Sequence, residues 1–235
     1  MYHDIAKDII KNILSKKYED KLPTETALMK SYHASRNTIR KAIDLVFAHG
    51  LLRRVQGSGY YIIERPVKSK KVLNMSIGFD QTAMVDGGPL KSKVVVFDKI
   101  KANQELAKQG RVDLNSELYR IWRLRYLQGK LYDLEEAYYP TSVVPYLPAE
   151  SVEHSIFAFI RKEYHLKGST TENYIQLTKL AKKEANLLKV NEGKSVLSLA
   201  GINYLKNGIV FNFSRTYFVY PDLVLYYHTM NIDSD

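Results

Sequence analysis

Apolar residues recur at helical spacing in the first third of the chain, and this pattern predicts three helices. The first spans residues 4–17, where two adjoining apolar stripes share one face. The second is short, begins after the N-cap residue Thr24 and ends near Tyr32. The third begins after Ser35, a second suitable N-cap residue, and Gly50 ends it, because glycine favours the position that follows a helix. Its buried face is formed by Ile39, Ala42, Ile43 and Val46.

Two short apolar strands follow the third helix and enclose a turn with two glycines. The strands are predicted over residues 51–55 and 60–63, and the turn is Gln56-Gly57-Ser58-Gly59. Glycine permits positive φ angles and lets the backbone approach another molecule closely. Two short helices joined by a tight turn, followed by such a hairpin, have the order of a winged helix-turn-helix.

Beyond residue 72 the apolar pattern alternates between strands and helices. Helices are predicted over residues 103–109, 155–164 and 178–188. Strands are predicted over residues 94–97, 118–128, 131–139, 171–176, 196–204 and 209–219. Asn207-Gly208, between the last two strands, predicts a type I′ turn. Hairpins mixed with helices indicate an α+β domain around a mainly antiparallel sheet.

The net charge of +10 sharpens this division, because the basic excess is concentrated in the N-terminal part. Residues 1–71 carry 15 Lys and Arg against 7 Asp and Glu, whereas residues 72–235 carry 20 against 18. A generally basic surface would spread the excess evenly. The distribution therefore favours nucleic acid as the partner of the N-terminal part alone.

Composition excludes several other classes of protein. The chain has no cysteine, so disulfides, thiolate zinc sites and cysteine catalysis are excluded, and its six histidines lack paired metal-ligand spacing. Neither a membrane-spanning run nor a signal-peptide pattern is present. Gly57-Ser58-Gly59 lies between strands and is no dinucleotide fingerprint. We expect a cytoplasmic protein without a metal or cofactor and without membrane association.

The third helix presents basic and polar residues at its N-terminal end, the part of a helix-turn-helix that enters the DNA major groove. Arg36 and Arg40 can each bind guanine O6 and N7 in a fork, and free backbone N–H groups suit phosphate oxygens. The alternative is an ordinary solvated, charged helix face. The candidate DNA-binding residues are Thr24, Ser35, Arg36, Asn37, Thr38, Arg40, Arg53, Gln56, Gly57, Ser58 and Gly59.

The motifs of residues 22–62 resemble the DNA-binding domain of the GntR family of bacterial transcriptional regulators. They are Leu22-Pro23-Thr24-Glu25, then Ser35-Arg36-Asn37-Thr38-Ile39-Arg40, then Gly50-Leu51 with Arg54 and Gly57-Ser58-Gly59. One position departs from the family pattern. Thr26 stands where an arginine that contacts DNA is usual. The resemblance therefore implies that Arg36 and Arg40 read the bases.

The C-terminal part resembles the UTRA domain, the effector-binding domain of the HutC-type branch of that family, which has a chorismate-lyase-like fold. We expect an α+β protein with a winged helix-turn-helix domain over residues 1–64, a charged linker over residues 65–73, and a UTRA-type effector-binding and dimerisation domain with an antiparallel sheet over residues 74–235. In that family the ligand lies in a cleft between two hairpin-bearing halves. The residues that match its lining are Phe79, Asp80, Arg123, Arg125, Glu135, Ser155 and Asn212.

Arg123 and Arg125 lie two residues apart on one predicted strand, so both face the same side of the sheet. Arginine forks suit carboxylate or phosphate groups. The alternative is a ladder of cross-strand salt bridges on an exposed sheet face. Asp80 places a carboxylate where relatives bind phosphate, so a sugar or phosphosugar and a neutral or amino-bearing effector all remain open.

The sequence thus predicts an effector-responsive transcriptional regulator. The resemblance implies a homodimer that represses by binding a near-palindromic operator in double-stranded DNA and releases it when a small metabolite binds. Two alternatives remain. One is an enzyme of chorismate-lyase-like fold fused to a DNA-binding module, against which Glu135 and Glu136 point to opposite faces of a strand and cannot share a substrate. The other is a regulator with no ligand.

Overall fold

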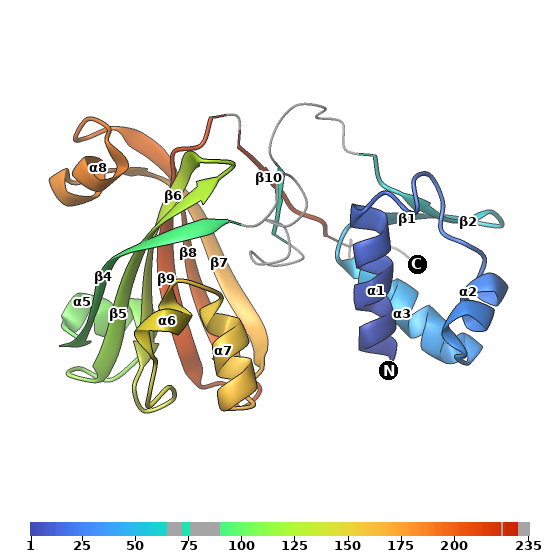
Figure 1. The fold of residues 1–235 in the computed structure, drawn as a ribbon, viewed down its shortest axis with the longest axis horizontal. Coiled ribbons are helices and arrows are strands. Elements are labelled where there is room, and N and C mark those ends of the chain that lie inside the picture. The colour runs from blue at the N-terminus through green and yellow to red at the C-terminus, as the bar shows by residue number, and fades with distance from the viewer. Residues whose placement is uncertain (65–71, 76–89, 222, 230–235) are drawn as a thin grey trace. The chain divides into compact units, whose positions relative to one another are not determined.

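The computed structural model describes residues 1–64, 72–75, 90–221 and 223–229. The chain divides into two compact units (Figure 1). We call Met1–Gly87 with Asp222–Asp235 the head unit and Gly88–Pro221 the sheet unit. The α+β fold class expected from the sequence is confirmed, with a helical head, wing strands and an antiparallel sheet.

Three helices form most of the head unit: α1 (Tyr2–Leu14), α2 (Glu25–Tyr32) and α3 (Arg36–Ala48). The predicted caps are present. Thr24 Oγ1 accepts a hydrogen bond from the Ala27 backbone N–H at 3.2 Å, and Ser35 Oγ accepts one from Thr38 at 3.3 Å. The turn between α2 and α3 is tight because His33 adopts a left-handed conformation. The buried faces of the helices join the first strand of the wing in one apolar core.

The wing consists of β1 (Leu52–Val55) and β2 (Gly59–Ile62), paired antiparallel. Gly57 and Gly59 have positive φ angles, as their place in the turn requires. The segment before α2 adds to this sheet, since the Leu22 N–H donates to the Tyr60 carbonyl and the Ile62 N–H donates to the Asp20 carbonyl, each at 2.9 Å. Strand β2 is therefore hydrogen-bonded on both of its edges, by β1 and by the segment before α2.

A second, two-stranded sheet in the head unit was not predicted. It pairs β3 (Val72–Asn74) in parallel with β10 (Val224–Tyr226). The Tyr226 hydroxyl donates to the Gly50 carbonyl at 3.1 Å, and His228 packs edge-on against Phe47. Residues 223–229, expected in the effector domain, are thus grouped with the head unit, because they contact it through Tyr226 and His228.

The sheet unit is built on six antiparallel strands in the order β4-β5-β6-β9-β8-β7. Their bounds are β4 Lys91–Lys101, β5 Glu117–Leu127, β6 Lys130–Pro140, β7 Gly168–Lys179, β8 Ser195–Leu205 and β9 Val210–Phe218. The two hairpins β5–β6 and β8–β9 meet where β6 pairs with β9. The two edge strands, β4 and β7, are longer than predicted, because they carry exposed polar residues that interrupt the apolar signal.

Helices cover both faces of this sheet (Figure 1). On one face, which we call the α7 face, α6 (Ala149–Val152) and α7 (Ile156–Glu163) pack on apolar side chains of β5 and β6. On the other, the α8 face, lie α5 (Gln104–Gly110) and α8 (Lys182–Leu188). Since side chains alternate along a strand, each strand contributes to both faces.

The turns correct one prediction. Asn207-Gly208 does not form a type I′ turn, because Gly208 has a positive φ angle and Asn207 does not. The Gly208 N–H donates to the Leu205 carbonyl, which leaves a three-residue loop. The two-residue turn with positive φ at both positions is Gln128-Gly129, between β5 and β6. A glycine at the second position of that turn is enough for a two-residue turn to form, although the first position is Gln128 and not asparagine or glycine.

Candidate DNA-binding surface and effector site

The N-terminal end of α3 is exposed on the surface of the head unit. The side chains of Arg36, Asn37 and Arg40 are exposed, whereas Ile39 is fully buried and holds the helix on the core. The Ser35 hydroxyl also lies 2.9 Å from the Thr38 hydroxyl. The cap therefore fixes the first turn, and its exposed side carries two arginines for a polyanion.

Glu25 at the start of α2 holds both of these arginines. Arg40 Nε donates to the two carboxylate oxygens at 3.0 and 3.1 Å, and Arg36 Nε lies 3.7 Å from the same carboxylate. This contact raises the pKa of Arg40, through the hydrogen bond first and the charge of Glu25 second. From the sequence, Glu25 is recognised only as part of the Leu22-Pro23-Thr24-Glu25 motif, and its role as a partner of the arginines is missed.

The wing carries a cluster of cations and tyrosines. The guanidinium of Arg53 lies 4.7 Å from the ring centre of Tyr61, and Lys21 Nζ lies 5.0 Å from it. The Tyr61 and Ser58 hydroxyls are 2.6 Å apart. These contacts hold Arg53 and the tip of the wing in place, because cation–π contacts and hydrogen bonds restrict the rotamers. The side chains of Arg53, Gln56 and Ser58 remain exposed.

The Arg123–Glu135 cluster, which comprises Arg123, Arg125, Asp133 and Glu135, lies on the α7 face of β5 and β6. Arg123 donates through Nε to Glu135 Oε2 at 2.7 Å. Arg125 donates through Nε to Asp133 Oδ1 at 2.7 Å and lies 3.4 Å from Glu135 Oε1. The two arginines share a face, as predicted from their spacing, and Glu135 lies between them.

This cluster is buried. Arg123 is 7 % exposed, Arg125 5 % and Asp133 0 %. The cross-strand ion pairs of the alternative interpretation exist, but the exposed sheet face that it requires does not. Burial raises the pKa of Asp133 to about 6 against the attraction of Arg125. Burial also disfavours the charged form of Glu135, but Arg123 and Arg125 outweigh it and lower that pKa.

The loop between α6 and α7 closes over the cluster. Arg123 Nη1 donates to the carbonyls of Val152 and His154, at 3.1 and 2.9 Å. Ser155 follows and caps α7, because its hydroxyl accepts a hydrogen bond from the Ala158 N–H at 3.2 Å. Ser155 thus lies at the edge of the cluster, because the carbonyl of the preceding residue, His154, is bound by Arg123.

Asn212 lies on the same face of the sheet but has other partners. Its side chain accepts a hydrogen bond from Asn203 and donates to the Tyr138 carbonyl. Thr216 is the residue of β9 that pairs with Glu135, and it is buried. Sequence reasoning missed Thr216 and Asp133, although Asp133 lies two residues before Glu135 and period-two alternation places both on one face. Phe79 and Asp80 lie outside the described residues.

In the described part of the chain, no helix combines the length and the apolar character that a membrane span requires. Among the same residues, no group of three or more His, Cys, Asp or Glu is placed to hold a metal ion.

Comparison with family models agrees with this architecture. The model described as bacterial regulatory proteins, gntR family, matches residues 1–62, and the UTRA domain model matches residues 86–221. The second match begins and ends close to the limits of the sheet unit. The first contains the three helices and the wing. Each compact body of the structure therefore has its own family match.

Individual relatives match nearly the whole chain. YydK of Bacillus subtilis, an uncharacterized HTH-type transcriptional regulator, is 31 % identical over 93 % of this chain and 93 % of its own. MngR of Escherichia coli, the mannosyl-D-glycerate transport/metabolism system repressor, is 28 % identical over 93 % of this chain and 91 % of its own. The crystal structure of YydK superposes with a TM-score of 0.77, at 29 % identity over 98 % of this chain and 99 % of that one.

The fold, the exposed arginines of α3 and the wing agree with both family matches, and the relatives span the same two parts. The chain therefore belongs to the HutC-type, UTRA-containing branch of the GntR family and is a DNA-binding transcriptional regulator.

Proposed function

We propose that this regulator is a repressor that leaves its operator when a small, sugar-type metabolite binds the sheet unit. The observation that carries this proposal is the buried Arg123–Glu135 cluster, because buried charges are costly and mark functional sites. The name of MngR, a repressor of a mannosyl-D-glycerate system, supports a sugar derivative as the signal.

On DNA, the N-terminal end of α3 enters the major groove and the wing lies along the backbone. Arg36 and Arg40 read base edges. Phosphates are bound by two further groups of residues: Thr24, Ser35, Asn37 and Thr38 near the helix starts, and Arg53 and Gln56–Gly59 in the wing. In the free protein Glu25 holds the arginines in place. Because Glu25 contacts the Nε atoms, the Nη1 and Nη2 groups of these arginines can still donate to guanine.

The charges of the cluster favour an effector without a phosphate. Two arginines face two carboxylates, so the positive and negative charges of these four side chains cancel. A phosphate dianion would add two negative charges to a site whose cations already have partners. A neutral or zwitterionic sugar derivative instead exchanges hydroxyl groups for some of the existing hydrogen bonds. Ser155 and Thr216 lie at the edge of this site and are further contacts for such hydroxyl groups.

The chain connects the two units twice, between residues 87 and 88 and between residues 221 and 222. The strands nearest these connections are β3 and β10, which pair with each other. We propose that effector binding changes the position of the DNA-binding heads through this paired segment. A ligand shifts such an equilibrium only by its preference for one arrangement over the other.

A homodimer is part of the proposal, because two heads are needed to bind a near-palindromic operator in two successive major grooves. The edge strand β7 supports it. Both faces of β7 are largely exposed over its length, and Tyr174, Ile175 and Leu177 are among the most exposed large apolar side chains. An exposed apolar edge is a template for pairing with another chain, and a twofold axis pairs β7 with itself in antiparallel fashion.

We propose no enzymatic activity. Glu135 and Glu136 lie on opposite faces of the sheet, with Glu135 bound by Arg123 and Glu136 facing α8. An acid and a base that share one substrate would have to share a face. A protein that acts on the bacterial chromosome works in the cytoplasm.

Thermal-shift screening with sugars and their phosphate esters, followed by operator release in a gel-shift assay, tests the proposal. We expect a neutral sugar derivative to raise the melting temperature and to release DNA. Arg123→Lys and Thr216→Val should abolish both effects, whereas Arg161→Gln, on the exposed side of α7, should leave them unchanged. Stabilisation by phosphate esters alone, or release that persists in both variants, would contradict this assignment.

A further inference from the structure

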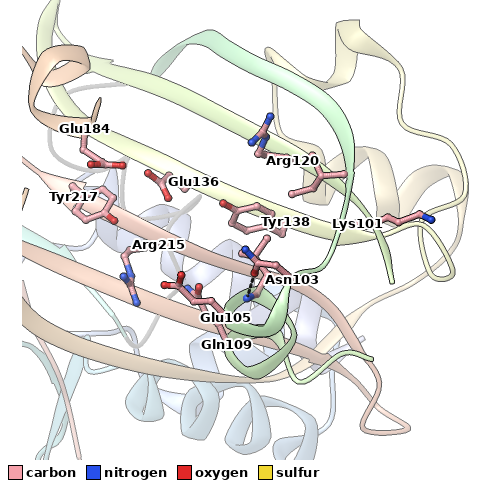
Figure 2. Close-up of a pocket in the computed structure, with 12 residues that line it drawn as sticks. Lys101, Asn103, Glu105, Gln109, Arg120, Glu136, Tyr138, Glu184, Arg215 and Tyr217 are labelled. Atoms are coloured by element: carbon pink, nitrogen blue, oxygen red, sulfur yellow. Dashed lines mark hydrogen bonds between the residues drawn. The ribbon is translucent and has the colours of Figure 1, made fainter. Parts of the chain in front are cut away.

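A cavity lies on the α8 face of the sheet unit, opposite to the Arg123–Glu135 cluster. It has a volume of about 480 Å³ and opens between α5 and α8, over the seam where β6 pairs with β9. Figure 2 shows Glu136, Arg215 and Tyr217 around one end, below Glu184 of α8. The volume is in the range of pockets that bind small molecules.

Three polar atoms in the lining of this cavity are buried without a hydrogen-bond partner. They are Glu136 Oε1, Glu184 Oε2 and Arg215 Nε. Glu136 is 9 % exposed, so its carboxylate is largely removed from water. Buried polar atoms are otherwise almost always paired, because an unpaired one costs stability. Three of them around one cavity indicate a ligand that is complementary to them.

Glu136 and Arg215 face each other across the β6–β9 seam, because they are register partners. No ion pair joins them among the contacts of the described residues, although opposite charges on paired strands usually meet. Arg120, the other arginine of the lining, is engaged by Asp98, with its Nε 2.9 Å from Oδ1. The unpaired groups therefore comprise two carboxylate oxygens and one guanidinium N–H.

The two carboxylates repel each other, and the attraction of Arg215, Lys183 and Arg120 does not outweigh this repulsion and the burial of Glu136. Burial and the negative charge of Glu184 raise the pKa of Glu136 to about 7. A positive group between Glu136 and Glu184 would relieve both the repulsion and the missing hydrogen bonds. Among the described residues no third acidic or histidine ligand is placed to complete a metal site. An ammonium group, with three donors that need no fixed geometry, matches this pair better than a metal ion.

The rest of the lining suits a polar ligand body. Tyr138 and Tyr217 present aromatic rings from β6 and β9, and Asn103, Glu105 and Gln109 close the end formed by α5 (Figure 2). Arg215 Nε supplies a donor for a ligand oxygen. Hydroxyl groups on a short carbon skeleton would satisfy these donors and acceptors, since each hydroxyl both donates and accepts.

We propose that the cavity between α5 and α8 is a second ligand site, which binds a small polyhydroxy amine with its ammonium group between Glu136 and Glu184 and an oxygen on Arg215. The site is independent of the effector site proposed above, because Glu136 and Glu135 are neighbours on β6 that point to opposite faces of the sheet. An experiment can therefore contradict one of the two proposed sites without contradicting the other.

The only tryptophan of the chain is a reporter for this face. Trp122 pairs with Glu136 in the register of β5 and β6, and Lys183 of α8 lies 3.6 Å from its ring centre. We would titrate the full-length protein with 1-amino-1-deoxy-sorbitol and with glucosamine. Sorbitol and glucose serve as matched probes that lack the amine. The readout is the fluorescence of Trp122 together with its indole N–H resonance.

The proposal predicts that the amines shift the Trp122 signals saturably at millimolar concentration or below and that the matched polyols do not. Glu136→Gln and Glu184→Gln should each weaken amine binding about tenfold, the effect of losing one charge-assisted hydrogen bond. Glu192→Gln, on the exposed loop after α8, should bind as the wild type does. Circular dichroism of each variant shows that it is folded.

Four results would each overturn the proposal. The first is that no amine in the panel shifts the Trp122 signals. The second is an equal response to the amine and to its matched polyol. The third is unchanged amine binding in the Glu136→Gln Glu184→Gln double variant. A change of sedimentation coefficient in that variant without any amine binding would also overturn it, because it would assign the cavity to a second copy of the chain.

Discussion

Glu25 restrains Arg36 and Arg40, the two arginines that we propose to read the bases, in the protein without DNA. Its carboxylate accepts two hydrogen bonds from Arg40 and lies near Arg36, which limits the rotamers of both side chains. Preorganised groups lose less entropy when they bind. Glu25 also carries a negative charge on a surface that must approach phosphates, so it opposes binding to DNA of any sequence.

Glu25→Gln should therefore separate specific from non-specific binding. We expect affinity for the operator to fall about tenfold, because the arginines lose a charge-assisted contact that positions them. Affinity for a scrambled duplex should rise, because a negative charge has been removed. Fluorescence anisotropy with both duplexes measures the two effects, with Glu19→Gln as an exposed control. A parallel change of both affinities would show that Glu25 does not position the arginines.

Glu136 makes the stability of the sheet unit depend on pH. Its pKa is raised to about 7, by burial first and by Glu184 second, while Arg215, Lys183 and Arg120 act in the opposite direction. The folded state therefore holds this proton at pH values where the unfolded state has lost it. The free energy of unfolding falls as the pH rises from the unfolded pKa through the folded one.

Glu136→Gln should remove this loss of stability at high pH. At about pH 8 the variant should exceed the wild type in free energy of unfolding by up to about 3 kcal/mol, and at about pH 4 the two should be alike. Urea denaturation followed by Trp122 fluorescence at both pH values measures the difference. If the variant were equally or less stable than the wild type at the higher pH, Glu136 would be either exposed or paired.

At the scale of elements, the β3–β10 pair depends on the turn after α3. Gly50 has a φ angle of +67°, and a Cβ atom placed on it would lie 2.5 Å from the His228 Cβ. Gly57 in the wing also has a positive φ angle, +73°, but nothing lies within 4 Å of a Cβ atom there. Both positions strain an L-residue, and only Gly50 would also displace the C-terminal segment.

Gly50→Ala and Gly57→Ala are thus a matched pair. Each should cost about 1 kcal/mol of backbone strain, and Gly50→Ala should in addition release the segment from the head. The Met75 N–H donates to the Tyr226 carbonyl at 2.9 Å. Hydrogen exchange of a peptide that contains Met75 should accelerate in Gly50→Ala alone. Equal exchange in the two variants would show that the contact at Gly50 does not hold the strand pair.

These elements also show what a sequence can predict. The three helices and the wing follow from local signals: N-cap hydroxyls at Thr24 and Ser35, and glycines where positive φ is required. The β3–β10 pair joins residues about 150 positions apart, and no local sequence pattern predicts such a pairing. For the same reason Thr216 was missed beside Glu135, and the cavity over β6 and β9 appears only once α5 and α8 are packed on the sheet.

At the scale of the whole molecule, the proposed dimer depends on β7. Leu177 is 77 % exposed on this edge strand, and a charge there should block pairing with a second copy. Leu177→Glu should convert the dimer to a monomer in sedimentation velocity and reduce operator affinity. The control is Leu114→Glu, which changes another exposed leucine. A variant Leu177→Glu that stays dimeric would place the interface elsewhere.

The central claim is that the heads of this protein read DNA through α3, and a selection from random duplexes tests it most directly. The full-length protein should enrich one near-palindromic sequence with half-sites about one helical turn, or a multiple of it, apart. Arg36→Ala and Arg40→Ala should each lose about 1–3 kcal/mol of affinity for that sequence and relax the base preference. Failure to enrich any sequence, or full affinity in both variants, would contradict the account.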